Sequence, residues 1–382
     1  MSNMDAVLER AVAQQDVPFV VGMAAGADGV RYSGAAGNCA QGKAAGEDSV
    51  FRIFSMTKAV GSVAAMLLID RGKIRFDTPV ADIVPEFANV QVLDGFDGDT
   101  PVLRAPRTRA TMRQLATHTC GLEYELWNGD MARYLEVTGH PDILSGHEAS
   151  LMYPMMTDPG TRWGYGIGID WLGQVVEAVD GRRIDAFCRE EIFEPLGMER
   201  TAFELDEGLS ADLCDLFARG EDGLLAPFEL APPSQPDFYG MGHCLYSTAP
   251  DYLRFLRMVL RGGELDGNRI LSEQGVADMT ADHMQGLTLE KLVTAAPELT
   301  ADFEPFPGTR VTHCFAFMRN EEAIPGRRSA GSLSWAGLCN THFWLDPARD
   351  IAAVIMTQSL PFVEERYMAT YDAYERAVYA SL

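Results

Sequence analysis

Hydrophobic and polar residues follow three successive patterns along this chain. In segment 1–15 the apolar residues recur at helical spacing, which predicts a first helix. Two apolar runs, 19–25 and 30–36, flank a short turn that contains Asp-Gly, and this arrangement predicts a β-hairpin. A further apolar run, 63–69, predicts a helix that begins near Ser55.

The second pattern, between residues 78 and 233, consists mainly of amphipathic helices and long loops. Short helices are expected over 111–115 and 171–177, and another over 183–192 that is closed by Pro195-Leu196-Gly197.

The third pattern follows a proline-rich linker at 231–236. A helix over 250–260, capped by Ser247, precedes a series of apolar segments that are typical of successive antiparallel strands. These expected strands cover 311–319, 331–335, 341–346 and 351–358, and a final helix covers 363–379.

Strands and helices at both ends of the chain, around a helical middle, predict one α/β (α+β) domain that both termini build. We expect its first part at 1–77, an inserted, mainly helical domain at 78–233, and its second part at 234–382. A length of 382 residues suits such a composite unit.

Charge and cysteine content narrow the choice of partners and compartment. The formal net charge is −24, and such a field repels nucleic acid and anionic membranes, so a small-molecule partner is expected instead. The seven cysteines are odd in number and form no C-x-x-C, which disfavours zinc and disulfides and favours free thiols. The first residues do not resemble a signal peptide, and no run of 18 apolar residues occurs, so a cytoplasmic location is expected.

The most informative local pattern is Ser55-Met56-Thr57-Lys58 at the start of a predicted helix. A lysine three positions after a serine lies on the same helix face, where its amine can take the serine proton. The helix N-terminus adds partial positive charge where an oxyanion would form. Taken alone, the pattern also fits a serine N-cap followed by a solvated lysine.

Two later segments offer partners for this pair. Tyr165 lies in a glycine-rich loop before a helix, where its hydroxyl could relay protons or could simply pack on the loop. Trp335 is followed by Ala336 and Gly337, and small residues at a strand edge let a substrate lie against the backbone. An ordinary core strand that ends in a glycine bend is the alternative.

Five segments in one order span nearly the whole chain: Ser55-Met56-Thr57-Lys58, residues 115–122, residues 159–165, residues 245–252 and Trp335-Ala336-Gly337. This series resembles the class C β-lactamase superfamily and, within it, the family VIII carboxylesterases. The resemblance implies a β-lactamase-like fold, with an antiparallel sheet flanked by the N- and C-terminal helices and an inserted helical domain.

The resemblance also implies roles for individual residues. Ser55 would be the nucleophile, Lys58 its general base and Tyr165 the catalytic tyrosine. The backbone N–H groups of Ser55 and Leu338 would form the oxyanion hole. No cofactor is implied, and no cluster of histidine and carboxylate residues has the spacing of a metal site.

Two departures separate this chain from true β-lactamases. Ile167 stands where they have an amide, and Trp335 stands where their Lys-Thr-Gly triad has a cation. A β-lactam bears a carboxylate that the cation would bind, whereas an indole suits neutral groups. Family VIII enzymes resemble this chain in having the tryptophan.

The walls of a substrate pocket are harder to predict. Residues near the five segments that could line it, or could equally belong to the core, are Tyr124, Trp127, Trp163, Tyr239, Met241 and His243. His118 has no G-x-S-x-G serine to partner, and the resemblance places it in a structural turn.

The sequence therefore predicts a serine hydrolase that cleaves short-chain, neutral carboxylic esters through an acyl-enzyme on Ser55. Within the enzyme class the alternatives are β-lactamase or D-peptidase activity, and acyl transfer to an alcohol. A ligand-binding protein of the same fold, without turnover, is the alternative from another class. The oligomeric state stays open.

Overall fold

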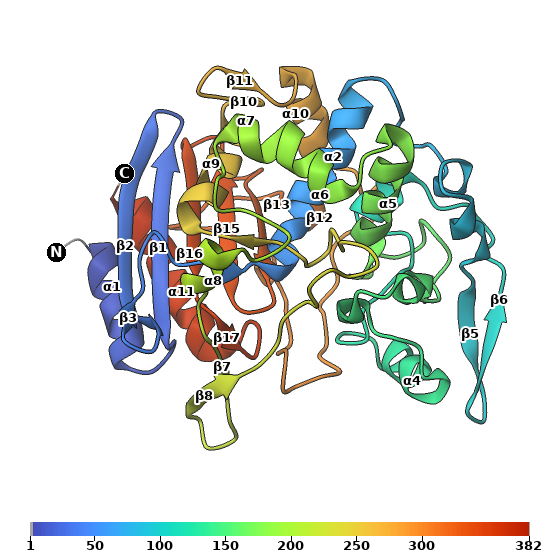
Figure 1. Ribbon diagram of the computed structural model, residues 1–382, viewed down its shortest axis with the longest axis horizontal. Coiled ribbons are helices and arrows are strands. Elements are labelled where there is room, and N and C mark those ends of the chain that lie inside the picture. The colour runs from blue at the N-terminus through green and yellow to red at the C-terminus, as the bar shows by residue number, and fades with distance from the viewer. Residues whose placement is uncertain (1–2, 382) are drawn as a thin grey trace.

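An eight-stranded sheet built from both ends of the chain organises the molecule. The structure is a computed structural model that describes residues 3–381. The strand order is β12-β13-β14-β15-β16-β1-β2-β3, and adjacent strands are antiparallel. Strands from the two chain ends meet where β1 pairs with β16 (Figure 1). The expected β-lactamase-like fold, mixed α/β with an antiparallel sheet, is confirmed.

The strands of the main sheet are β1 (Phe19–Gly26), β2 (Gly29–Ala40), β3 (Lys43–Ala44), β12 (Val311–His313), β13 (Met318–Asn320), β14 (Leu333–Gly337), β15 (Thr341–Asp346) and β16 (Ile351–Met356). The smaller sheets use β4 (Phe51–Arg52), β5 (Val92–Asp97), β6 (Thr100–Arg104), β7 (Leu216–Arg219), β8 (Leu225–Phe228), β9 (Tyr246–Ser247), β10 (Glu264–Leu265), β11 (Asn268–Arg269) and β17 (Ser359–Leu360).

The helices are α1 (Asn3–Ala13), α2 (Thr57–Asp70), α3 (Met112–Ala116), α4 (Gly129–Thr138), α5 (Gly168–Asp180), α6 (Ile184–Cys188), α7 (Glu194–Leu196), α8 (Glu207–Ala211), α9 (Ala249–Leu260), α10 (Glu273–Thr280) and α11 (Glu365–Ala380). The expected first helix is thus present from residue 3, and its first two positions lie outside the described residues. Segment 78–233 holds α3 to α8 and two hairpins, but the division of the chain at 77 and 233 stays a prediction.

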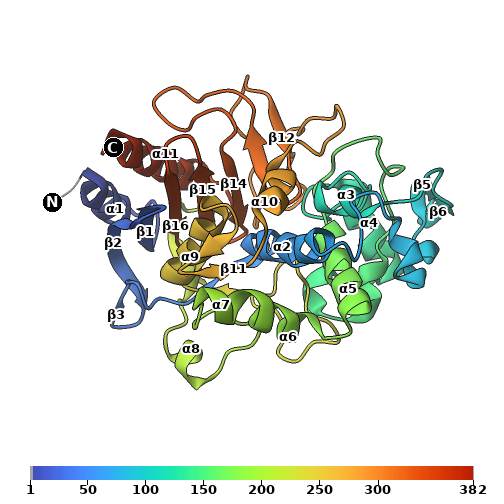
Figure 2. The ribbon, with the colours of Figure 1, turned by 90° about the horizontal axis from the view of Figure 1, so that it is seen from above.

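The two faces of the sheet are covered by different helices (Figure 2). The terminal helices α1 and α11 pack on one face, where Val20 and Ile355 point. Helix α9 packs on the other face, where Val21 and Val354 point. Alternate residues of β1 and β16 therefore serve separate cores, as the two-residue period of a strand requires. Helix α2 lies between the sheet and the helices of the middle segment.

Three sequence predictions need correction at the level of elements. The expected strand 311–319 is a hairpin of two strands, β12 and β13. The helix cap before α9 is Thr248, whose side chain accepts from the N–H of Asp251, and not Ser247. The helix expected to end at residue 192 runs on, because a π-helical turn, Arg189–Phe193, carries the chain into α7, and it ends at Leu196 with Gly197 as the left-handed C-cap, at the expected Pro-Leu-Gly stop.

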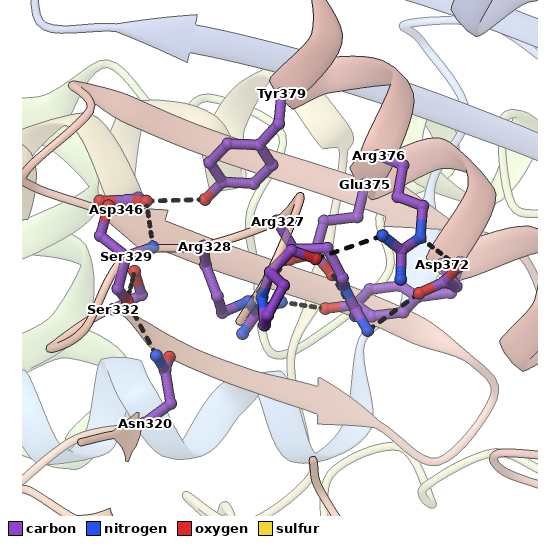
Figure 3. Close-up of polar contacts among 12 residues, drawn as sticks. Asn320, Arg327, Arg328, Ser329, Ser332, Asp346, Asp372, Glu375, Arg376 and Tyr379 are labelled. Carbon is purple, nitrogen blue, oxygen red and sulfur yellow. Dashed lines mark hydrogen bonds and ion pairs between the residues drawn. The ribbon is translucent and has the colours of Figure 1, made fainter. Parts of the chain in front are cut away.

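A buried ionic network fixes α11 to the sheet (Figure 3). Arg328 and Glu375 are both fully buried, and Arg328 Nε donates to the Glu375 carboxylate at 2.8 Å. Tyr379 donates to Asp346 on β15 at 2.9 Å. Loss of either partner should destabilise the fold, because the other charge would remain buried without a counter-ion.

All seven cysteines are free and buried, as expected. Among residues 3–381, no helix combines the length and the apolar character that crossing a membrane requires.

Candidate active site

Ser55 lies in a 3-10 turn, Phe54–Met56, that leads directly into α2. The sequence placed it in the first turn of the α-helix, so the helix begins slightly later than expected. Phe54 has a φ of 39°, a backbone conformation that non-glycine residues rarely adopt. This kink turns the chain at the point where Ser55 faces a cavity.

Lys58 is directed at Ser55 by three hydrogen bonds. Its Nζ lies 3.1 Å from Ser55 Oγ, 2.9 Å from the hydroxyl of Tyr124 and 2.8 Å from the carbonyl of Gly242. The side chain is 2% exposed, so it is not the solvated lysine of the alternative interpretation. Serine and amine are therefore close enough for direct proton transfer.

Tyr124 completes the surroundings of Lys58. Burial, and secondarily the charge of Asp170, raise the pKa of Tyr124 well above its usual value. Its hydroxyl therefore stays protonated and accepts from the lysine amine as a neutral group. The sequence predicted Tyr124 only as a pocket wall, and the structure adds this direct contact.

Tyr165 lies on the other side of Lys58. Its ring centroid is 4.9 Å from Lys58 Nζ, and its hydroxyl receives a long hydrogen bond, 3.4 Å, from the indole N–H of Trp335. The ring of Tyr124 meets that of Tyr165 edge-on at 5.2 Å. The structure thus brings Ser55, Lys58 and Tyr165 together, as the sequence predicted.

His118 supports this group from behind. It has a φ of 57°, and its ring contacts Tyr165 edge-on at 4.8 Å and stacks on Trp335 at 6.3 Å. Burial, with smaller contributions from His313 and Lys58, lowers the pKa of His118 well below its usual value. It is therefore a neutral packing residue, in keeping with its expected structural role.

Strand β14 brings the second half of the site to Ser55. A side chain at Gly337 would overlap the carbonyl of Ile53, so glycine lets this strand approach the Ser55 turn. Gly337 serves this packing and does not itself line the cavity. Ser55, Ala336 and Leu338 do line it, and the oxyanion hole made from the N–H groups of Ser55 and Leu338 stays a prediction.

A cavity of about 990 Å³ opens beside Ser55. Trp127, Tyr165, Trp335 and His243 line it, together with apolar residues of the 292–306 segment. The charged residues among its lining are Glu125, Asp142, Glu298, Asp302, Glu304 and Arg327. Arg327 already pairs with Glu375 and Asp372 (Figure 3), and Asp302 pairs with Lys291, so the remaining acidic residues give the cavity net negative charge.

Three predicted pocket walls belong elsewhere. Trp163 is 2% exposed and packed in the core, away from the cavity. Tyr239 bonds Glu204 through its hydroxyl at 2.8 Å. Met241 packs over Gly61 and Gly173, where α2 and α5 approach each other closely. These residues stabilise the scaffold and do not contact the cavity.

Sequence reasoning missed two residues close to Lys58. Asp170 is fully buried in the first turn of α5, and its Oδ1 accepts from the N–H of Gly242 at 2.8 Å. Gly242 in turn accepts from Lys58. The only available signal was an acidic residue in the first turn of a helix, five positions after Tyr165, and that position is common for solvated acids.

Comparison with known proteins now adds to this geometry. The Beta-lactamase family model matches residues 4–377. The chain belongs to the Beta-lactamase family. The lovastatin esterase of Penicillium rubens is 28% identical over 337 residues, which cover 84% of this chain and 82% of the relative. The monacolin J acid methylbutanoyltransferase of Aspergillus terreus is 26% identical over 400 residues, 99% of this chain and 95% of the relative.

A solved structure shows the same architecture. A mutant of simvastatin synthase (LovD) from Aspergillus terreus matches with a TM-score of 0.85 and 25% identity, over 99% of this chain and 96% of that one. This member of the Beta-lactamase family thus belongs among serine hydrolases and acyltransferases, which supports its being an enzyme. Within the described part of the chain, no group of three or more histidine, cysteine or acidic residues could hold a metal ion.

Proposed function

We propose that this protein is a serine hydrolase of neutral carboxylic esters that works through an acyl-enzyme on Ser55. The observation that supports this most directly is the set of contacts around Lys58. Lys58 Nζ lies within hydrogen-bond distance of Ser55, Tyr124 and Gly242 at once. In its free-base form the amine can donate its two protons to Gly242 and Tyr124 and direct its lone pair at the proton of Ser55.

The reaction follows from these positions. Lys58 removes the Ser55 proton as Oγ forms a bond to the ester carbonyl carbon, and the carbonyl oxygen gains negative charge. The N–H groups of Ser55 and Leu338 stabilise that charge. The C–O bond to the alcohol then breaks, and the alcohol leaves with the proton held by Lys58 and relayed by Tyr165. Water, deprotonated by the same pair, releases the acid.

Charge favours neutral esters as substrates. The carboxylates that line the cavity repel an anionic substrate, and Trp335 offers no charge to a carboxylate. A β-lactamase or D-peptidase function would need a cation at the position of Trp335 to bind the substrate carboxylate, so both remain weaker candidates. The intact serine and lysine disfavour a purely ligand-binding role.

The cavity volume changes the expectation for acyl chain length. Cavities that bind drug-sized ligands measure roughly 300–1,000 Å³. A volume of about 990 Å³ therefore admits esters far larger than acetate or butyrate. We retain short-chain esters as substrates and extend the proposal to bulky neutral ones.

Acyl transfer to an alcohol is the second candidate function. One relative is named a methylbutanoyltransferase and another an esterase, and both reactions pass through the same kind of covalent intermediate. The cavity is large enough to hold an acyl group together with an acceptor alcohol.

Covalent labelling tests the proposal. After incubation with a slowly hydrolysed ester or an alkyl phosphonate, mass spectrometry should find the adduct on the peptide that contains Ser55. Ser55→Ala should lose about 10³-fold or more in kcat on p-nitrophenyl esters. Adducts on another serine, or near-full activity of the variant, would refute it. In the presence of an added alcohol, the ratio of free acid to new ester then measures how the acyl-enzyme partitions between hydrolysis and acyl transfer.

A further inference from the structure

Asp170 is an acidic side chain buried where the mechanism has not yet used it. It is 0% exposed, and its Oδ1 accepts a hydrogen bond from the N–H of Gly242 at 2.8 Å. Its Oδ2 has no hydrogen-bond partner among the described residues. His243 Nδ1 lies 3.6 Å from Oδ1, but burial lowers the pKa of His243 to about 3, so that ring is neutral.

The chain around Asp170 leaves room for a carboxylate and for little else. A side chain at Gly240 or at Gly242 would press on the oxygens of Asp170. Two glycines that flank Met241 thus allow this loop to close over the acid. A buried carboxylate with one oxygen left unpaired is costly unless a cation is near.

The nearby cation is Lys58, on the far side of Gly242. The N–H of Gly242 donates to Asp170 at 2.8 Å, and its carbonyl accepts from Lys58 at 2.8 Å. One glycine therefore holds the acid and the amine in fixed relation. Burial raises the pKa of Asp170 to about 6, and the charge of Lys58 opposes that rise. Above that pH the carboxylate is ionised.

We propose that Asp170 is a positioning residue, the fixed counter-charge of Lys58, coupled to it through Gly242. This inference rests on the proposed function and deepens it. As Lys58 takes the proton of Ser55 it becomes an ammonium, and a carboxylate already in place stabilises that charge without reorganisation. Asp170 itself does not touch the reacting atoms.

The other groups near this pair do not supply the charge. Tyr124 and Cys244 face Asp170, and the pKa of each is raised chiefly by burial, so both are neutral. The pKa of His118 and that of His243 are lowered chiefly by burial, with a smaller contribution from the charge of Lys58, so both rings are neutral. Tyr165 lies beside Lys58 through its ring.

The test is the pH–rate profile of Asp170→Asn on p-nitrophenyl butyrate. Removing the carboxylate makes the ammonium form of Lys58 less favourable. The part of the pH–rate profile where kcat/KM rises with pH, its acidic limb, should therefore move to lower pH by about one unit. The high-pH plateau should fall about tenfold or more, because the developing ammonium loses its counter-charge. A merely structural role would lower the whole profile without moving the limb.

Asp251→Asn is the matched control. Asp251 is also buried in the first turn of a helix and accepts from a backbone N–H, that of Arg200 at 2.7 Å. Its variant should leave the position of the limb unchanged. An unchanged limb in folded Asp170→Asn, or equal shifts in both variants, would overturn the proposal.

Thermal unfolding gives a second test, which does not depend on the kinetics of Asp170→Asn. At pH 8, Lys58→Met strands the charge of Asp170 and should lower the melting temperature. Adding Asp170→Asn to Lys58→Met should raise it again. A double variant less stable than Lys58→Met would overturn the coupling. If the wild-type protein forms no adduct on Ser55, the proposed function fails, whereas an adduct with no shift in the limb refutes only the role of Asp170.

Discussion

At the scale of single residues, the site differs from a simple serine–lysine pair because two tyrosines approach the same amine. Tyr124 bonds Lys58 through its hydroxyl, whereas Tyr165 presents its ring to Lys58 and its hydroxyl to Trp335. The first contact fixes the direction of the amine. The second leaves a hydroxyl beside the cavity, where it can pass a proton to a leaving group.

Replacing each tyrosine by phenylalanine should separate these roles. Tyr165→Phe should lower kcat about 10²-fold, since proton relay is lost while packing remains. Tyr124→Phe should cost less, about tenfold, because Lys58 keeps its contact with Gly242. Steady-state kinetics on p-nitrophenyl butyrate measure both. Wild-type activity in Tyr165→Phe would show that this residue only packs.

Trp335 sets a second prediction at this scale. A charge-assisted hydrogen bond to a carboxylate is worth about 1.5–3 kcal/mol, or roughly 10- to 150-fold in rate. The wild-type enzyme should therefore hydrolyse p-nitrophenyl acetate much faster than nitrocefin. Trp335→Lys should move the ratio towards nitrocefin, modestly, because Ile167 still lacks an amide. A wild-type kcat/KM on nitrocefin that equals the ester value would contradict this.

Residue-level prediction from sequence succeeded where the information is local or belongs to a motif. Ser55 and Lys58 are three positions apart, so a helical turn alone brings them together. Asp170 and Gly242 are 72 positions apart, and no spacing rule predicts that contact. The core position of Trp163 likewise depends on how the middle helices pack on α2, which periodicity does not specify.

At the scale of elements, catalysis depends on how closely β14 approaches the Ser55 turn. The turn precedes α2, and β14 enters from the far end of the chain, so the two halves of the proposed oxyanion hole come from separate elements. Gly337 permits the approach because a side chain there would meet the backbone of Ile53, which cannot rotate away.

Gly337→Ala should therefore impair catalysis more than folding. Moving β14 by even part of an ångström displaces the Leu338 N–H from the oxyanion, and loss of one such donor typically costs 10²–10³-fold in kcat. Gly46→Ala is the control, since no atom lies within 4 Å of its added methyl group. The measurements are kcat and the melting temperature of both variants. Unaltered kcat in Gly337→Ala would show that the strand tolerates the methyl group.

Most elements followed from the sequence because their periodicity is strong and their ends are marked. The hairpin of β1 and β2 and the final helix α11 lie where expected. The failures share a physical cause, which is a backbone irregularity that tertiary packing imposes. The π-helical turn at Arg189–Phe193 carries a helix into Pro195, and the expected strand 311–319 folds back on itself.

At the scale of the whole molecule, four of the histidines, His118, His243, His313 and His342, are buried without charge. Burial is the main cause that lowers the pKa of His243 and His342 to about 3 and that of His313 to about 4. His118 is lowered in the same way. These residues lie in or beside the cavity and beneath α11, so their neutrality is a condition of the packed state.

Acid should therefore destabilise the protein well before its carboxylates are fully protonated. Above about pH 6.5 both folded and unfolded histidines are neutral, and they add no pH dependence. As pH falls below 6.5 the unfolded chain binds protons that the folded chain excludes, so the free energy of unfolding decreases until the folded-state pKa is reached. Five carboxyl groups whose pKa is raised by burial, those of Asp16, Glu125, Asp170, Glu177 and Asp251, act in the opposite direction, so the contribution of a single histidine is measured from its variant.

Urea unfolding at pH 7 and pH 5 measures this effect. Each excluded proton is worth about 1.4 kcal/mol per pH unit, so a single buried histidine contributes up to about 2 kcal/mol between pH 6.5 and 5. His342→Phe should flatten the dependence, because its ring stacks between aromatic neighbours and its Nε2 has no partner among the described residues. His147→Phe, at a position whose side chain is 67% exposed, should not flatten it. If His342→Phe kept the same pH dependence as the wild-type protein, this ring would be open to water or paired in the folded state, and the neutral packing of the cavity wall would then be wrong.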